Sequence, residues 1–248
     1  MSSSPGTLAT VFGRELRGYF ASPLAAIFLV VFLALSAGLT FFVGRFFDRG
    51  QADLATFFSW HPWLFLILMP AIGMRLWAEE RRTGTIEMLM TLPTRPWALV
   101  LGKFLAGWVF SGLALLLTAP IWITVNYLGD PDNGVILASY LGSWLMAGGF
   151  LAVSACISVL TRNQVIAFIV AVIVSFLLVM AGSELVLAAI RGWMPGAITE
   201  TIQSLSIIAH FNRLTRGVLE LNSLFFFVSL IVLCLWLNVR FLEVKRAS

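Results

Sequence analysis

The stretch from Asn133 to Thr161, NGVILASYLGSWLMAGGFLAVSACISVLT, contains no charged residue and decides the fold class of this protein. The hydrocarbon core of a bilayer is about 30 Å thick, so roughly 20 apolar residues cross it as a helix. A membrane strand would instead alternate polar and apolar residues over about ten positions. The run is continuous and longer than 20 residues, and it therefore predicts a transmembrane helix.

Five further apolar runs have a similar length. The whole chain is 60% hydrophobic and 11% charged, with a mean hydropathy of +0.96, whereas soluble domains carry roughly 25% charged residues. The run from Leu185 to Ile208 is not counted, because Arg191, Pro195 and Glu200 interrupt it. We predict an all-α polytopic membrane protein in one domain, 1–248, with six spans at about 22–44, 58–78, 98–128, 134–161, 163–183 and 221–241.

The basic residues predict the orientation. With the N-terminus in the cytoplasm, most of the 16 Lys and Arg residues fall in inner segments, and the short outer loop from Asp130 to Asn133 is acidic. This bias is the positive-inside rule, so both termini are expected in the cytoplasm. Trp77 and Trp97 are expected at the inner membrane edge.

A separate helix is predicted before the first span, over residues 7–20. Its apolar residues recur with a helical period, while Arg14 and Arg17 occupy the other face. Such a helix lies in the membrane interface as an elbow, and Ser22-Pro23 ends it. The alternative is an ordinary positively charged anchor.

The highest charge density lies between the second and third spans, in Arg75–Glu87. Thr83-Gly84-Thr85 interrupts a charged extension of the second span, and a short amphipathic helix is expected after it, ending at Pro93. A rigid element of this kind could pass a push from a cytoplasmic partner into the neighbouring spans. The alternative is a solvated loop that follows the positive-inside rule.

This segment resembles the E-(x)-x-x-G-T-x-E-x-L-x-x-x-P pattern of ABC-2 type permeases, the membrane subunits of ATP-binding-cassette transporters. The expected spans, elbow helix and cytoplasmic termini are similar to that family over the whole chain. Ser206–Leu221 resembles the corresponding segment of the gliding-motility permease subgroup. The resemblance implies that segment 79–93 couples to an ATPase, through Glu79, Glu80, Arg81, Arg82, Thr83, Gly84, Thr85, Glu87, Leu89 and Pro93.

Residues 184–220 are too apolar for a solvated loop. Leu185–Ile190 and Ile202–Ala209 look helical, with a turn cluster between them. They are too short to span, so they are expected to enter the outer leaflet and return, unless they form a surface loop. The resemblance implies an external gate, with Trp193, Pro195, His210, Phe211, Arg216 and Gly217.

Catalytic and metal-binding patterns are missing from the sequence. There is no G-x-x-x-x-G-K-[ST] phosphate loop, and His61 and His210 each stand alone, so no metal site is expected. No charged residue falls in the middle of a predicted span, which argues against an ion-coupled transporter. We therefore expect no catalytic residue and no cofactor in this chain.

The leading hypothesis is half of a permease. The resemblance implies two copies of an ATPase subunit that bind ATP and Mg, a second permease subunit that is identical or homologous, and a bacterial inner membrane location. Nucleic acid is not an expected partner. Two alternatives stay open: an intramembrane enzyme acting on lipid-linked substrates, which would pair Glu184 with His210 or Arg213, and an ATPase-driven subunit that moves an external component without transporting a solute.

Overall fold

The computed structural model describes residues 5–86, 95–183, 186–188, 196–217 and 220–247. These residues form helices and no strand, which confirms the all-α prediction. In chain order the helices are α1 (Pro5–Ala21), α2 (Pro23–Gly38) with the π-helical turn η1 (Leu39–Val43), α3 (Ala55–Ser59), α4 (His61–Gly73), α5 (Arg75–Thr83), α7 (Pro96–Leu116), α8 (Ala119–Leu128), α9 (Asn133–Ser158), α10 (Gln164–Met180), α12 (Gly196–Ser204), α13 (Ile207–Leu214) and α14 (Leu221–Ala247).

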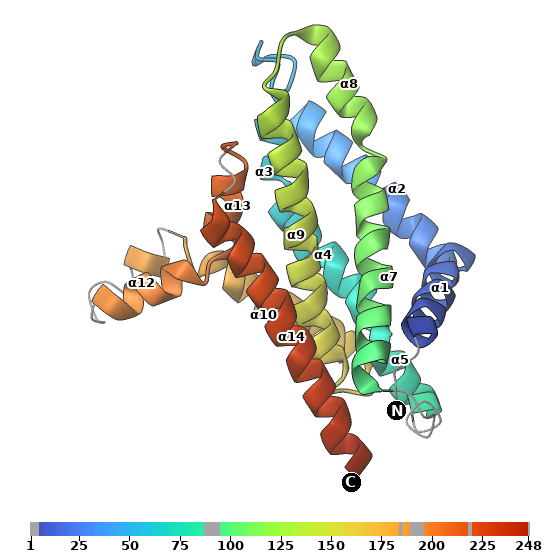
Figure 1. The fold of residues 1–248 in the computed structure, drawn as a ribbon. Helices are drawn as coiled ribbons and strands as arrows, with labels where there is room; N and C mark the ends of the chain where they lie inside the picture. Colours follow the sequence, from blue (N-terminus) through green and yellow to red (C-terminus); the bar gives the residue numbers. More distant parts are fainter. Residues whose placement is uncertain (1–4, 87–94, 184–185, 189–195, 218–219, 248) are drawn as a thin grey trace.

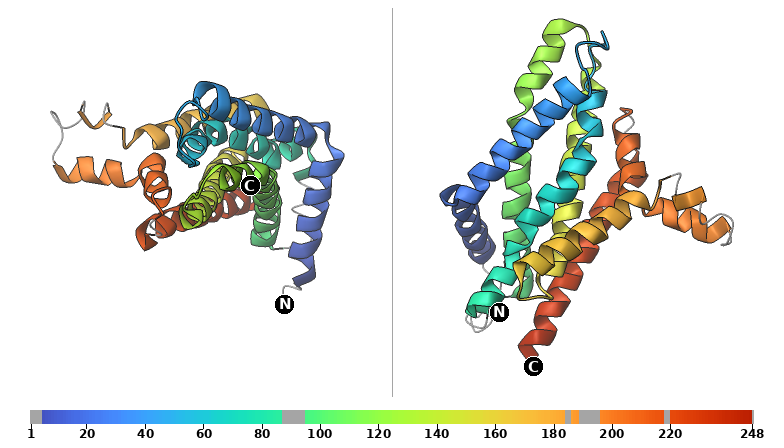
Figure 2. Two further views of the ribbon diagram at one scale, coloured as in Figure 1. Left: turned by 90° about the horizontal axis from the view of Figure 1, so that it is seen from above. Right: turned by 180° about the vertical axis from the view of Figure 1, so that it is seen from behind.

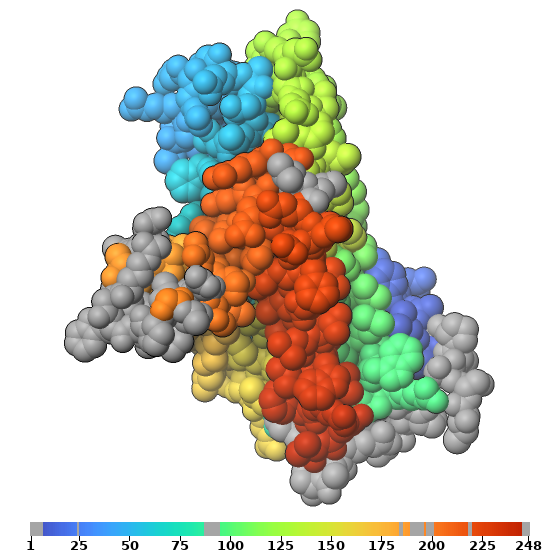
Figure 3. Space-filling model, turned by 60° about the vertical axis from the view of Figure 1, so that its left-hand side comes forward, coloured from blue at the N-terminus to red at the C-terminus, as the bar shows by residue number. Residues whose placement is uncertain are grey.

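Helix α9 lies at the centre of the bundle and contacts α4, α7, α10 and α14 (Figure 1). In its most apolar 18-residue window, 67% of the residues are buried, against 22% in the corresponding window of α14. Small residues allow this close packing, because helices in lipid associate through tight contact of their backbones. A Cβ on Gly142 would lie 3.1 Å from Leu214 of α13. Figure 3 shows α14 lying along the surface beside α7.

A symmetric pair of tryptophans joins α7 to α9. The Trp108 and Trp144 rings stack at 4.3 Å, and each indole Nε1 donates to the backbone carbonyl of the other residue, at 2.8 and 3.0 Å. Each ring also lies over a glycine of the opposite helix, Trp108 over Gly148 and Trp144 over Gly112. The two W-x-x-x-G segments therefore form one interlocked contact whose indole donors are both satisfied.

Four of the predicted spans are confirmed as helices long and apolar enough to cross a membrane. Among the described residues these helices are Ala25–Val43, Pro96–Leu128, Asn133–Ser158 and Leu221–Val244. The third of the predicted spans, 98–128, consists of α7 and α8. The two helices separate at Leu117–Thr118, because Pro120 has no N–H for the helical ladder.

The prediction of six spans is not confirmed for the second and fifth. The fifth, predicted at 163–183, is the 17-residue helix α10. The second, predicted at 58–78 as one helix, is divided into the end of α3, α4 and the first four residues of α5.

The break between α4 and α5 has a cause in α9. Ser158 Oγ donates to the Met74 carbonyl at 2.8 Å and accepts from the N–H groups of Trp77 and Ala78, at 3.2 and 3.0 Å. In an unbroken helix these N–H groups would bond to carbonyls four residues earlier. The serine hydroxyl takes the place of those carbonyls, so the chain changes direction at Met74 while these two N–H groups keep an acceptor.

The region before α14 contains two short helices, but their bounds differ from the prediction. The helix expected at 202–209 is divided between α12 and α13, because Ser206 begins a new helix by accepting from the Ala209 N–H at 3.3 Å. Helix α12 projects sideways from the bundle (Figures 1 and 3). The stretch expected at 185–190 is described only over residues 186–188.

Both ends of the described chain lie at one end of the molecule, together with α5 (Figure 1). The helix predicted at 7–20 is present as α1, and it ends before Pro23 as expected. Seen from above, α1 lies across the bundle axis at the edge of the molecule (Figure 2). Helix α8 and the loop between η1 and α3 lie at the opposite end.

Candidate functional site

The charged segment predicted to couple to a partner begins within helix α5. This helix ends at Gly84. Gly84 adopts a left-handed conformation, with φ of 73°, which glycine reaches without strain and which ends a helix. The hydroxyls of Thr83 and Thr85 lie 3.0 Å apart. Thr83 also donates to the Glu79 carbonyl at 3.0 Å, and Thr85 to the Glu80 carbonyl at 3.3 Å. The predicted interruption at Thr83-Gly84-Thr85 is thus a turn held by its own side chains.

Helix α1 packs closely on α7. Val11, Glu15 and Tyr19 recur every four residues, so they share one face of α1. A Cβ on Gly102 would lie 2.8 Å from Val11, and a Cβ on Gly107 would lie 3.2 Å from the Tyr19 hydroxyl. Tyr19 stacks on Phe110 of α7, with the ring centroids 5.2 Å apart. Two glycines of α7 therefore allow this face of α1 to approach.

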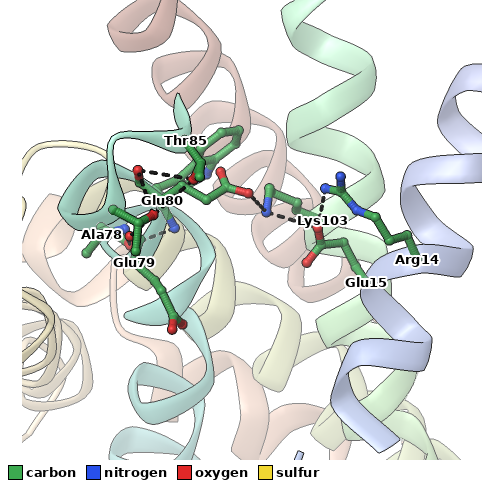
Figure 4. Close-up of polar contacts among 10 residues, drawn as sticks. Arg14, Glu15, Ala78, Glu79, Glu80, Thr85 and Lys103 are labelled. Atoms are coloured by element: carbon green, nitrogen blue, oxygen red, sulfur yellow. Dashed lines mark hydrogen bonds and ion pairs between the residues drawn. The ribbon is translucent and has the colours of Figure 1, made fainter. Parts of the chain in front are cut away.

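Lys103 of α7 lies between two carboxylates that come from two other helices (Figure 4). Its Nζ is 3.1 Å from Glu15 Oε1 of α1 and 2.8 Å from Glu80 Oε1 of α5. The lysine side chain is only 4% exposed, and the two glutamates are 21% and 17% exposed. We call Glu15, Glu80 and Lys103 the charged junction.

Two neighbours complete the charged junction. Arg14 donates to Glu15 Oε1 at 2.8 Å from the exposed side of α1. The Lys103 ammonium also lies 5.3 Å from the ring centroid of Trp77, within the range of a cation–π attraction. Trp77, which is expected at the inner membrane edge, is buried within the bundle. Its ring covers the lysine.

The two carboxylates of the junction differ in their electrostatics. Burial acts to raise the pKa of Glu15, but the positive charges of Lys103 and Arg14 outweigh it, and the pKa is lowered. Burial raises the pKa of Glu80, and Lys103 offsets only part of that effect. Glu80 Oε2 is also buried without a hydrogen-bond partner among the described residues. Glu15 is therefore held as a carboxylate, and Glu80 is the group that takes up a proton first.

This arrangement can transmit a displacement. A buried ammonium loses strong interactions when either carboxylate moves away, because the remaining charges are poorly solvated. Helix α5 is also held to α9, where Arg81 donates to the Val159 carbonyl at 2.6 Å. A push on the Gly84 end of α5 would therefore reach α7 and α1 through Lys103, and α9 through Arg81 and Ser158.

The structure places the predicted coupling residues in different environments. Glu80 belongs to the junction, whereas Glu79 pairs with Arg75 of its own helix at 3.2 Å. Arg82 is exposed, as is Arg17 of α1. Glu87, Leu89 and Pro93, with the short helix predicted around them, lie outside the described residues, as do Trp193 and Pro195 of the predicted gate.

The described residues of the predicted external gate lie on α13 and just after it. His210 Nδ1 is 3.2 Å from Ser223 Oγ of α14, and its Nε2 is 2.9 Å from the Ser204 carbonyl of α12. Its ring stacks on Phe226 at 4.1 Å. His210 thus joins three helices, and burial lowers its pKa.

The other gate residues have different surroundings. Phe211 is buried and faces Gly142 of α9. Arg216 is exposed. Gly217 has φ of 80°, and a Cβ there would lie 2.6 Å from Val135.

The alternative of an intramembrane enzyme involves Arg213, which pairs with Glu220 at 3.6 Å. Glu184, which that alternative pairs with His210 or Arg213, lies outside the described residues.

Two members of the charged junction were not singled out from the sequence. In the sequence Lys103 is one of the inner basic residues and follows a glycine without forming a phosphate loop, and Glu15 is not among the predicted site residues. A signal was present for each. Glu15 is the one acidic residue of α1, on its apolar face, and Lys103 follows Gly102 inside an apolar run.

Residues 62–242 match the sequence model of a family described as ABC-2 family transporter protein. The matched part covers α4 to α14 and includes Glu80 and Lys103 of the charged junction. No curated protein sequence matches the chain significantly.

Proposed function

This chain belongs to the ABC-2 family of transporter proteins and is a membrane subunit of an ABC transporter; from that premise we propose that it forms half of a membrane pathway driven by a separate ATPase subunit. ATP and Mg²⁺ are bound by that partner. The chain itself supplies the helices that move and the contact through which they are moved.

One observation carries the proposal: the charged junction joins the end of α5 to α7 and α1 through a single buried ammonium. Segment 79–93 is the docking element in this proposal. The ATPase pushes on the Gly84 turn, and the junction conveys that displacement to the spans. A solvated loop would not need a buried ion pair at its base.

The arrangement of the chain ends supports the orientation. Helix α1, the Gly84 end of α5 and the last turn of α14 lie at the same end of the molecule (Figure 1), and the predicted inner segments hold most of the basic residues. We place this end in the cytoplasm of a bacterial cell, with α1 as the elbow helix in the membrane interface.

The complete transporter in this proposal has two ATPase subunits and a second permease subunit, identical or homologous to this chain. The resemblance of Ser206–Leu221 to the gliding-motility subgroup favours a homologous partner. The assembly exports a solute or moves an external component, and residues 184–220 form its outer gate.

Affinity purification of the full chain in a mild detergent tests the central claim. An ATPase subunit is expected to co-purify, and its hydrolysis is expected to respond to the permease. Purification of a chain that is active alone, with no ATPase subunit bound, would overturn the proposal.

A pair of glycine substitutions then tests where the ATPase acts. Gly84→Pro is expected to abolish coupled ATP hydrolysis, because proline fixes φ near −65° and cannot adopt 73°. Gly50→Pro is the matched control, since Gly50 also has a positive φ, of 61°, and open space around its Cβ. Gly50 belongs to the loop between η1 and α3 at the opposite end. Equal hydrolysis in both variants, at equal thermal stability, would refute docking at the Gly84 turn.

A further inference from the structure

A cavity of about 280 Å³ lies beside the charged junction, where α1 meets the start of α2, the end of α4, and α5 and α7. One group of its lining residues is polar: Glu15, Tyr19, Ser22, Arg75 and Glu79. The other group is apolar and includes Phe28, Ile72 and Phe110. The cavity is therefore amphipathic. A site for a simple ion would need only the polar residues, and a purely hydrophobic conduit would need only the apolar ones.

Two of the apolar lining residues lie beyond the polar ones along the chain segments that carry them. Along α2, Phe28 is six residues beyond Ser22, which is about 9 Å at 1.5 Å per residue. Along α4 and α5, Ile72 precedes Arg75 by one turn on the side of the bundle interior. Phe28 and Ile72 therefore lie further along their segments from Ser22 and Arg75, while the Phe110 ring stacks on Tyr19 where the two groups meet.

Apolar surface continues from the cavity to the outside. Phe20 packs edge-on against the lining ring of Phe110 at 5.9 Å and is 60% exposed. On α2, Ile27 and Val30 follow and are also exposed. Acyl chains can lie on this surface while a headgroup occupies the cavity.

The charges of the cavity come in both signs. Arg75 and Glu79 form an ion pair at 3.2 Å, and each side chain is more than a third exposed. Both ion pairs of Glu15 use Oε1. The Tyr19 phenol stays protonated and able to donate, because burial raises its pKa. Hydrogen-bond donors for an anion and carboxylates for a cation therefore line the same space.

We propose that this cavity binds the headgroup of a phospholipid with a primary amine, of the phosphatidylethanolamine class, from the leaflet in which α1 lies. The phosphate accepts from the Arg75 guanidinium and the Tyr19 hydroxyl. The ammonium donates to the carboxylates of Glu79 and Glu15. The lipid thereby replaces one internal ion pair by two charge-assisted contacts, and its chains pass over Phe20 and α2.

Other common headgroups fit these charges less well. Phosphatidylglycerol carries only a negative charge, so the carboxylates beside it would have no cation to accept from. Phosphatidylcholine carries both charges, but its quaternary ammonium has no N–H to donate. The cavity therefore distinguishes among lipids by the amine.

Native mass spectrometry of the purified full chain tests this site, with phosphatidylethanolamine, phosphatidylglycerol and phosphatidylcholine of identical acyl chains added separately. Phosphatidylethanolamine is expected to bind about tenfold more tightly than the other two, which corresponds to about 1.4 kcal/mol. Glu79→Gln should remove that preference, because it removes a carboxylate that accepts from the amine, whereas Arg75→Ala should weaken the binding of all three lipids, because each carries the phosphate. Equal retention of the three lipids would overturn the proposal.

Arg240→Ala is the matched control, because Arg240 also pairs with a glutamate of its own helix, Glu243, at 3.2 Å. It lies on α14, away from the cavity, and should leave the preference unchanged. If Arg75→Ala lowers monodispersity, Arg75→Lys keeps the charge and still tests the geometry. A preference that survives in Glu79→Gln, or binding that is unchanged in both Arg75→Ala and Arg75→Lys, would place the lipid elsewhere. None of these measurements requires the ATPase, so this proposal can fail while the proposed transport function stands.

Discussion

Replacing Lys103 by methionine would remove the ammonium from the charged junction while keeping much of the side-chain volume. Glu15 Oε1 and Glu80 Oε1 each lie about 3 Å from Nζ, so they are at most about 6 Å apart. Two unit charges at about 6 Å, with an effective dielectric constant near 20, repel by about 3 kcal/mol. This agrees with the lower end of the loss measured when one partner of a buried ion pair is removed. We expect the variant to lose about 3 kcal/mol of stability at pH 7.5.

The loss should depend on pH in a defined direction. Without the ammonium, burial and mutual repulsion raise the pKa of both carboxyl groups above their values in the unfolded chain. Stability that depends on such a group is lost as the pH rises through the folded-state pKa and recovered as the pH falls. Thermal unfolding in detergent should therefore show a deficit of roughly 6 to 12 °C at pH 7.5. The deficit should narrow toward pH 5.

The double variant Lys103→Met, Glu80→Gln separates this explanation from a simple packing defect. It leaves Glu15, which still pairs with Arg14, and should recover most of the lost stability. Glu80→Gln alone should cost less stability than Lys103→Met, because Lys103 keeps its ion pair with Glu15. The reasoning is refuted if Lys103→Met unfolds like the unmodified chain, or if its deficit is the same at pH 5 and pH 8.

Two further substitutions test the packing around α9. Ser158→Ala should lower the free energy of unfolding by at least about 2 kcal/mol, because two backbone N–H groups lose their acceptor. The control is Ser139→Ala, which removes only a hydrogen bond within its own helix. It should be nearly neutral in the same thermal unfolding assay. Gly148→Ala should cost about 1–3 kcal/mol, since its Cβ would lie 2.7 Å from Trp108 Nε1. Gly38→Ala is the control, because a Cβ on Gly38 would have no atom within 4 Å, and it should not destabilise the chain. A similar loss of stability in both glycine variants would exclude the tryptophan contact as the cause.

The long apolar runs and the local helix ends could be predicted from the sequence. Apolar length alone indicates a membrane span, and Asn133–Ser158 and Leu221–Val244 follow that rule. The end of α1 before Pro23 and the turn at Gly84 also depend on local chemistry, because proline and glycine impose their backbone preferences in any surroundings. The family resemblance likewise rested on a continuous segment.

The division of the second span could not be predicted in this way. Met74 is not a helix-breaking residue, and the sequence from Arg75 to Ala78 contains no proline or glycine that would end the helix there. The acceptor that turns the chain there is Ser158, which is 84 residues away from Met74 in the sequence. The break between α4 and α5 thus results from a contact with α9.

Composition and hydrophobic pattern were sufficient to establish a helical membrane protein, because the free energy of transferring a helix into lipid depends on its own residues. The role of Lys103 was decided by the tertiary structure alone. A lysine inside an apolar run is tolerated only where the fold supplies partners for its charge, and Glu15 lies 88 residues away in the sequence. Whether such a charge faces water, lipid or two carboxylates depends on how α1, α5 and α7 pack together.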